Sequence, residues 1–352
     1  MGQKIRVGIL FGGKSAEHEV SIRSARNVAE AINKDTYQVV LIGIDKAGRW
    51  LPPAQSSELL GASSVPAAQS TVALAPGENG ELTNAAGHVD VVFPILHGPF
   101  GEDGTVQGLL KLANVPFVGP DVLGSAVGMD KDVMKRLLRD AGIPIGKFLV
   151  STKLEDVSYD EAVRALGLPL FIKPANLGSS VGVSKASSEH EYRDALIEAF
   201  RYDRKVLIEA FIKGREIECS VLGNDNPIAS LPGEIIVHAD FYSYDAKYAD
   251  EDGASLKIPA DLSPETTARV QELAIRTFKA LCCEGMGRVD SFVTETGEVF
   301  VNEINTIPGF TNISMYPKMW EASGISYPDL IDRLITLAIE RFGKQQALKT
   351  SK

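Results

Sequence analysis

Hydrophobic spacing divides the first third of the chain into strands and helices. Residues 5–11, 39–44 and 89–96 are nearly continuous apolar runs, a pattern typical of strands buried on both faces of a parallel sheet. After the first run, apolar residues recur at helical spacing: Ile22, Ala25, Ala29 and Ile32. Another helix is expected over 105–113. The alternation predicts an open α/β domain, in which ligands usually bind beyond the carboxyl ends of the strands.

The middle of the chain carries two Ser-x-x-Glu sequences, which begin at Ser158 and Ser188. Each is a capping-box signal, in which the serine side chain accepts a hydrogen bond from the first turn of a helix. They predict helices over 159–166 and 189–201, with a short apolar strand at 170–174 between them.

That strand leads into a turn rich in glycine and serine, residues 175–183, which contains Ser179 and Ser180. Glycine permits close backbone approach, so such a turn can present N–H groups to a phosphate. Lys173 precedes the turn and adds a cation. We interpret the turn as a candidate phosphate site, with an ordinary hairpin as the alternative. Lys131, at the start of another helix, opposes the helix dipole and so also indicates a function.

The strongest signal for chemistry is a predicted hairpin near the C-terminus. Two alternating runs, 288–293 and 299–305, flank a glycine-bearing turn. If they pair, Asp290 comes near Glu303 and Asn305. Oxygen ligands without His or Cys suit Mg²⁺, whereas bare carboxylates at this distance repel each other. A solvated hairpin face is the alternative, but it does not explain the oxygen- and glycine-rich loop that follows.

The remaining segments carry weaker signals. Residues 54–88 are rich in Ala, Ser, Gly and Pro, and we expect loops and short strands there. Residues 239–257 are polar and aromatic, which favours an ordered surface loop of the kind used as a lid. Helices are predicted over 264–283 and 327–342, with a frayed tail from 343 onward.

Composition limits the partners. A chain of 352 residues is expected to form two or three domains, and its net charge of −10 argues against nucleic acid or an anionic membrane as the main partner. Three cysteines, two of them adjacent, make no disulfide framework and fit a reducing compartment. No apolar run reaches membrane length and no signal-peptide pattern opens the chain, so we expect a cytoplasmic protein.

Together, Asp290, Glu303-Ile304-Asn305 and Pro308-Gly309 resemble the magnesium-binding strand pair of the ATP-grasp superfamily, and more narrowly the D-alanine–D-alanine ligase family. The resemblance implies an α/β ATP-grasp fold of three domains, 1–124, 125–216 and 217–352, with ATP held between the second and third. It also implies two Mg²⁺ ions, which Mn²⁺ can replace. The implied small-molecule substrates are ATP and D-alanine, and the implied assembly is a homodimer.

The resemblance extends to the nucleotide site. It implies that lysines neutralise the phosphates, namely Lys131, Lys173 and Lys247. The turn that contains Ser180 would cover these phosphates as a lid. Glu209 would accept from the adenine amino group, Ala210 and Ile212 would offer backbone atoms to the ring, and Glu216 would bond the ribose.

The amino-acid site is implied in the same way. Glu19 would hold the ammonium group of the first D-alanine, although from the residues alone it equally fits a carboxylate that complements a helix dipole. Ser179 would orient that substrate, and Tyr248 would form hydrogen bonds with the side chains of Glu19 and Ser179. The retained pair Lys247-Tyr248 favours an amine as second substrate.

The remaining implied roles concern the reaction centre. His97, in the match His97-Gly98-Pro99-Phe100-Gly101-Glu102-Asp103-Gly104, would lie near the substrate. Arg288 and the N–H of Gly309 would meet the oxyanion of a tetrahedral intermediate. Ser314 and the N–H of Met315 would bind the carboxylate of the second substrate.

Three other functions stay open. A relative of altered specificity would join D-alanine to D-lactate or D-serine. A non-catalytic nucleotide-binding module on the same fold would be expected to lose the metal ligands, yet all three are present. A dinucleotide oxidoreductase fits least, because the sequence Gly12-Gly13-Lys14-Ser15 lacks the glycine fingerprint of that class.

Overall fold

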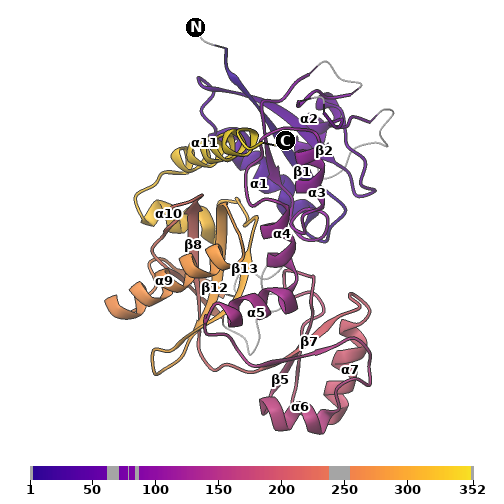
Figure 1. Cartoon of the computed structure of the whole chain (residues 1–352), viewed down its shortest axis with the longest axis vertical. Helices are drawn as coiled ribbons and strands as arrows, with labels where there is room; N and C mark the ends of the chain where they lie inside the picture. The colour runs from indigo at the N-terminus through magenta and orange to yellow at the C-terminus, as the bar shows by residue number, and fades with distance from the viewer. Residues whose placement is uncertain (1–2, 62–70, 78, 84–86, 238–253, 350–352) are drawn as a thin grey trace.

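The structure is a computed structural model, and it describes residues 3–61, 71–77, 79–83, 87–237 and 254–349. Its strands form three separate sheets, stacked along the long axis of the molecule (Figure 1). Within the described residues, no helix combines the length and the apolar character needed to cross a bilayer.

The first sheet is parallel and has the order β2-β1-β3. It consists of β1 (Ile5–Gly12), β2 (Tyr37–Ile44) and β3 (Val91–Ile95), which confirms the three predicted strands. Helices α1 (His18–Ala31), α2 (Pro53–Gly61) and α3 (Thr105–Leu112) surround the sheet. Helix α2 corrects the expectation of loops and short strands there, because two of its residues, Ser56 and Leu59, become buried.

Two helices lead from this sheet into the next, α4 (Val122–Met129) and α5 (Lys131–Asp140). The Asp130 side chain accepts hydrogen bonds from the N–H groups of Asp132 and Val133 and so caps α5. Gly142 follows α5 with a φ of 63°, which only glycine adopts readily, as expected for the residue just past a helix end.

The second sheet is antiparallel, with the order β4-β7-β5-β6. Its strands are β4 (Phe148–Ser151), β5 (Leu170–Pro174), β6 (Ser184–Ala186) and β7 (Val206–Ala210). Helices α6 (Tyr159–Leu166) and α7 (Glu189–Ala199) pack on it. Both capping boxes are confirmed, because Ser158 and Ser188 accept from the N–H groups of Glu161 and Glu191.

The third sheet has six strands and the order β11-β10-β8-β12-β13, with β9 paired to β8. Its strands are β8 (Arg215–Gly223), β9 (Ile228–Ala229), β10 (Gly233–Val237), β11 (Ala254–Lys257), β12 (Gly285–Val293) and β13 (Val299–Asn305). Helix α9 (Pro264–Ala280) buries Val270, Leu273 and Phe278 against this sheet. The surface loop expected over 239–257 is corrected at its last four residues, which form strand β11.

The last two helices are α10 (Met315–Ala322) and α11 (Tyr327–Gln346). Helix α10 is not predicted by the sequence pattern, and α11 continues past residue 343, where fraying is expected. Side-chain hydrogen bonds hold the extension, because Gln345 donates to Asp121 at 3.1 Å and Gln346 donates to Asn114 at 2.7 Å. One turn earlier, the buried Arg341 donates to the carbonyl of Phe117 at 2.7 Å and lies over the ring of that residue.

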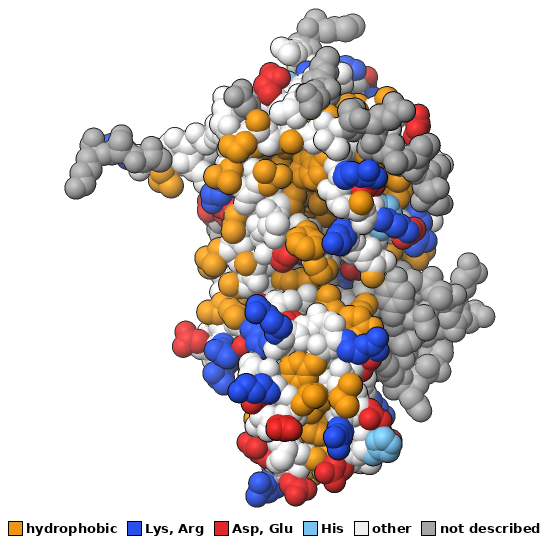
Figure 2. Space-filling view, turned by 90° about the vertical axis from the view of Figure 1, so that its right-hand side faces the viewer, with side chains coloured by type: hydrophobic (Ala, Val, Ile, Leu, Met, Phe, Trp, Pro, Cys, Tyr) orange, Lys and Arg blue, Asp and Glu red, His pale blue; other side chains and the backbone are white. Residues whose placement is uncertain are grey.

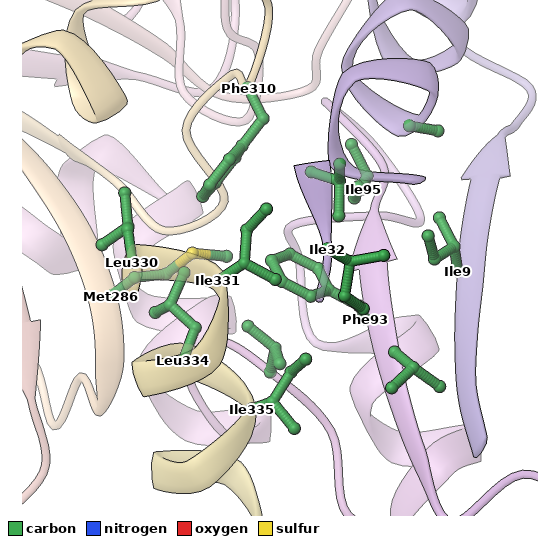
Figure 3. Close-up of a cluster of buried hydrophobic side chains, with 14 of the residues drawn as sticks. Ile9, Ile32, Phe93, Ile95, Met286, Phe310, Leu330, Ile331, Leu334 and Ile335 are labelled. Atoms are coloured by element: carbon green, nitrogen blue, oxygen red, sulfur yellow. The ribbon is translucent and has the colours of Figure 1, made fainter. Parts of the chain in front are cut away.

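Helix α11, near the C-terminus, packs against the first sheet, which is formed by the N-terminal part of the chain. Ile331 and Leu334 belong to the same buried cluster as Ile9 and Phe93 of the first sheet (Figure 3). Phe310, from the loop after β13, meets Phe93 edge to face with ring centroids 5.7 Å apart. The predicted domain limits at 124/125 and 216/217 fall inside α4 and at the start of β8, and they stay predictions.

Candidate active site

A cavity of about 460 Å³ lies between the second and third sheets. Side chains from both sheets and from α5 line it. Nine of the predicted nucleotide and metal residues are among them, together with Ser179 of the predicted amino-acid site: Lys131, Lys173, Ser180, Glu209, Ala210, Ile212, Glu216, Asp290 and Glu303. On the face that Figure 2 shows, basic and acidic side chains are interspersed.

The predicted hairpin forms, and an irregularity in it shapes the cavity wall. Asp290 pairs with Glu303, but the next residue, Ser291, pairs with Val301, so Asn302 is an extra residue in β13. Such a β-bulge redirects side chains that would otherwise alternate between faces. Asn302 and Glu303 consequently both line the cavity although they are neighbours in sequence.

The acidic groups of the hairpin are held by cations of the chain itself. Arg288 donates to both oxygens of Asp290 at 2.8 Å, and the Asn305 amide donates to Asp290 at 2.9 Å. Lys131 lies 3.2 Å from Glu303. Arg288 also lies 3.0 Å from Glu218; burial opposes its charge, but the two carboxylates outweigh burial and raise its pKa.

These residues fit a magnesium site by the chemistry of their donors. Asp290 and Glu303 supply carboxylate oxygens and Asn305 supplies an amide oxygen, the hard ligands that Mg²⁺ prefers. Within the described residues, no group of three His, Cys, Asp or Glu side chains gathers in a way that could hold a metal ion. The cations now beside the carboxylates show that this position already stabilises positive charge.

The other end of the cavity is built around Glu209, which is buried. Its Oε2 lies 2.9 Å from Lys173, and its Oε1 lies 3.2 Å from Lys135. Burial raises the pKa of Glu209, but the two lysines outweigh burial and lower it. Apart from the Lys135 ion pair, Oε1 has no partner with hydrogen-bond geometry among the described residues, so this carboxylate oxygen can accept a further donor such as an amino group.

An apolar wall stands next to Glu209. Phe171 and Phe211 are stacked with ring centroids 5.9 Å apart and both line the cavity. The N–H of Ala210 donates to the carbonyl of Lys147 at 3.0 Å, so this donor is already paired within the protein. An apolar slot with a few polar groups is the usual construction of a site for a planar base.

The glycine- and serine-rich turn closes one side of the cavity. Ser179 and Ser180 have φ values of 52° and 58°, a left-handed conformation that is uncommon for residues with a Cβ atom. Lys131 donates to the carbonyl of Leu177 at 2.7 Å, and Ser179 donates to Glu17 at 2.5 Å. The turn is therefore tied both to α5 and to the first domain.

The partner of Ser179 corrects one prediction. Glu19 lies on the outer side of α1, half exposed, and forms an ion pair with Lys46 at 2.6 Å. Glu17 reaches Ser179 instead, because it stands at the N-cap position before the helix while Glu19 lies in the first helical turn. Both glutamates occur in the matched segment, and only the geometry separates them.

A second loop, residues 306–314, is positioned by the first domain. Its Ile307 is bonded twice: His97 Nδ1 donates to the carbonyl at 3.1 Å, and the N–H donates to Glu102 at 3.2 Å. Burial and the nearby Glu17 raise the pKa of Glu102 to about 8, and burial lowers the pKa of His97. Glu102 is missed by the site prediction although it belongs to the same motif as His97.

The rest of this loop holds predicted substrate residues. Ser314 is the N-cap residue of α10, and its hydroxyl accepts from the N–H of Thr311 at 2.9 Å. Gly309 is so close that a Cβ there would lie 2.8 Å from the Ser314 hydroxyl, and Met315 is buried. Gly309, Ser314 and Met315 do not line the 460 Å³ cavity, and Lys247 and Tyr248 lie outside the described residues.

Comparison with known proteins defines the class and then the family. A solved structure of the D-alanine–D-alanine ligase from Coxiella burnetii superposes with a TM-score of 0.86 and 43% identity, over 98% of this chain and 97% of that one. The D-Ala:D-Ser ligase VanG from Enterococcus faecalis gives 0.85 and 37%, over 96% and 100%. The chain thus has the ATP-grasp fold of these ligases.

The sequence comparison is more specific. Residues 6–120 match the family described as D-ala D-ala ligase N-terminus, and residues 137–336 match D-ala D-ala ligase C-terminus. The D-alanine–D-alanine ligase of Shouchella clausii is 58% identical, over 99% of this chain and 98% of its own length. The chain belongs to the D-alanine–D-alanine ligase family.

Proposed function

We propose that this protein joins two D-alanine molecules into D-alanyl-D-alanine at the expense of ATP, for the synthesis of peptidoglycan precursors. The observation that carries the proposal is the cavity between the two sheets, where an apolar wall, the lysines Lys131 and Lys173, and the carboxylates of Asp290 and Glu303 lie together. Family membership supports the same activity.

The reaction has two chemical steps. A carboxylate oxygen of the first D-alanine attacks the γ-phosphorus of ATP, the bond to ADP breaks, and an acyl phosphate forms. The free amine of the second D-alanine then attacks the acyl carbon, a C–N bond forms, and phosphate leaves. Phosphoryl transfer of this kind depends mainly on positioning and on neutralising charge.

The nucleotide would bind in the cavity. Lys131 and Lys173 are proposed to meet phosphate oxygens, together with Lys247 from outside the described residues. Glu209 is proposed to accept from the adenine amino group at Oε1, the oxygen that Lys135 contacts from the side away from the cavity. Lys131 would leave Glu303 as the phosphates arrive, because both compete for the same ammonium group.

Magnesium would be held by Asp290, Glu303 and Asn305, where it supplies charge neutralisation on the triphosphate. Arg288 lies beside this group and is proposed, with the N–H of Gly309, to stabilise the oxyanion formed when the amine attacks. An oxyanion donor of this kind typically contributes about 2.7–4 kcal/mol.

The two amino acids would bind where the first domain meets the cavity. Glu17, in place of Glu19, is proposed to hold the ammonium group of the first D-alanine, with Ser179 beside it. Ser314 and the N–H of Met315 are proposed to bind the carboxylate of the second. His97 and Glu102 would keep the 306–314 loop in position through Ile307.

The test replaces one metal ligand and compares it with a neighbour. Glu303→Gln keeps the shape of the side chain but removes its charge, so ADP release in the presence of D-alanine and Mg²⁺ should fall by at least about a hundredfold. Glu295→Gln is the matched control on the same hairpin, because Glu295 is exposed and its one ion pair among the described residues is with the exposed Lys213. A Glu303→Gln protein with wild-type turnover contradicts the assignment.

A second candidate deserves the same assay, because VanG joins D-alanine to D-serine by its printed name and is 37% identical. Phosphate release is compared with D-alanine, D-serine and D-lactate as second substrates. We expect D-alanine to be preferred, and a preference for either competitor would move the protein to that specificity.

Two further properties complete the proposal. A homodimer is implied by the family; the adjacent helices α3 and α4 expose Leu112 and Leu123, which is consistent with a buried contact in an assembly. Light scattering measures this directly. A cytoplasmic location, where ATP is available, fits the proposed activity.

A further inference from the structure

Lys135 is a buried lysine that lies behind the cavity rather than in it. It belongs to α5, and only 1% of its surface is exposed. Glu209, Lys173 and Lys131 line the cavity, whereas Lys135 does not. A fully buried lysine is uncommon and unfavourable unless it is paired. Its place in the molecule therefore requires an explanation.

The partner of Lys135 is the carboxylate proposed to recognise adenine. Its Nζ lies 3.2 Å from Glu209 Oε1, which is its one ion pair in the part of the chain that the structure describes. It also lies over the ring of Phe148, 5.8 Å from the centroid. Burial lowers the pKa of Lys135, and the charge of Glu209 opposes that shift, so each group stabilises the charged form of the other.

Lys173, the second cation near Glu209, has two acceptors. Lys173 contacts Glu209 Oε2 at 2.9 Å and also donates to Asn302 of the third sheet at 3.3 Å. Its proposed role in phosphate binding would draw it further from Glu209 when a nucleotide is present. Lys135 faces no such competition, because it has no surface in the cavity.

We propose that Lys135 is a positioning residue for the nucleobase: it keeps Glu209 ionised and correctly oriented while Lys173 serves the phosphates. An ionised carboxylate only accepts hydrogen bonds, so it favours a base with an amino group at C6 and repels one with a carbonyl there. Lys135 would thus contribute to the preference for adenine over hypoxanthine without touching the nucleotide. The inference rests on the proposed role of Glu209.

The experiment measures binding of ADP and of IDP, each with magnesium chloride, by calorimetry. IDP differs from ADP in carrying a carbonyl in place of the 6-amino group. The ratio of the two dissociation constants does not depend on the fraction of folded protein, because both titrations lose the same fraction. A purely structural role of Lys135 would lower the active fraction and leave this ratio unchanged.

The variants form a cycle: Lys135→Met, Glu209→Gln and the double substitution. Lys135→Met should lower the ratio of the IDP dissociation constant to the ADP dissociation constant about tenfold. This is the size expected when a hydrogen bond to a charged group loses its charge or its alignment. In the Glu209→Gln background, Lys135→Met should leave the ratio unchanged. Arg136→Met is the matched control, because Arg136 is the next residue of α5, its side chain is exposed, and its partner Asp132 keeps a second cation, Lys205.

The outcomes separate the two levels of the argument. If Glu209→Gln keeps the full preference for ADP, Glu209 does not recognise the base, and both proposals are wrong at that point. If Glu209→Gln narrows the preference but Lys135→Met does not, only the role of Lys135 is overturned. Should Lys135→Met fail to fold, Lys135→Gln takes its place, and a wild-type ratio in that variant overturns the role equally.

Discussion

The contact between Glu17 and Ser179 permits a sharp test, because a second glutamate lies two residues away. Glu17→Gln and Glu19→Gln remove the same charge at nearly the same place in the sequence. Only Glu17 contacts the turn over the cavity, through the Ser179 hydroxyl at 2.5 Å. Glu19 contacts Lys46 on the outside of α1. Comparing the two variants therefore tests whether the residue that contacts Ser179 or the residue predicted from the family resemblance binds the substrate.

The expected size of the effect follows from these contacts. A hydrogen bond to a charged group contributes about 1.5–3 kcal/mol, and 1.4 kcal/mol corresponds to a factor of ten. If Glu17 binds the ammonium group of the first D-alanine, Glu17→Gln should lower kcat/KM for D-alanine by about tenfold to a hundredfold. Glu19→Gln removes a largely exposed ion pair, worth at most about 1 kcal/mol of stability, and no substrate contact.

The assay couples ADP release to NADH oxidation and varies D-alanine at saturating ATP, then varies ATP at saturating D-alanine. Glu17→Gln should act on the constants for D-alanine and leave the KM for ATP close to wild type. Glu19→Gln should match wild type in both series. The reasoning is refuted if Glu19→Gln impairs D-alanine use more than Glu17→Gln does.

Two further predictions concern stability. Ile331→Ala in the buried face of α11 should lower the free energy of unfolding by about 2–5 kcal/mol, measured by thermal or denaturant unfolding, whereas Ile339→Ala on the exposed side of the same helix, 38% exposed, should have a much smaller effect. Because folding raises the pKa of Glu102 to about 8, the folded protein binds a proton there that the unfolded chain releases above its usual pKa of 4.5. Stability from this group should thus be complete below about pH 4.5 and be lost progressively up to about pH 8, by at most about 5 kcal/mol. Glu102→Gln should reduce that loss, and an unchanged pH profile of unfolding would contradict it.

Local signals were sufficient for most of the secondary structure and for the metal hairpin. The apolar runs of the first sheet and the two capping boxes depend on interactions between near neighbours, which are visible in the sequence. The pairing of Asp290 with Glu303 follows from a short turn and from the alternation of side chains along strands. Signals of this range do not require knowledge of the rest of the chain.

Contacts between distant segments are different. The sequence pattern does not indicate that α11 packs on β1 and β3, because any apolar helix face needs only some apolar partner (Figure 3). No sequence pattern predicts the bulge at Asn302 either, yet because of it two consecutive side chains line the cavity.

The amino-acid sequence by itself therefore determined most of the elements, the pairing of the hairpin strands and the family to which the chain is similar. Only the tertiary structure showed that Glu17, and not Glu19, contacts Ser179, and only it placed Lys135 beside Glu209. The physical reason is the same in each case: which of two similar side chains reaches a site depends on the orientation of its helix against a segment far away in the chain, and that orientation results from packing of the whole molecule.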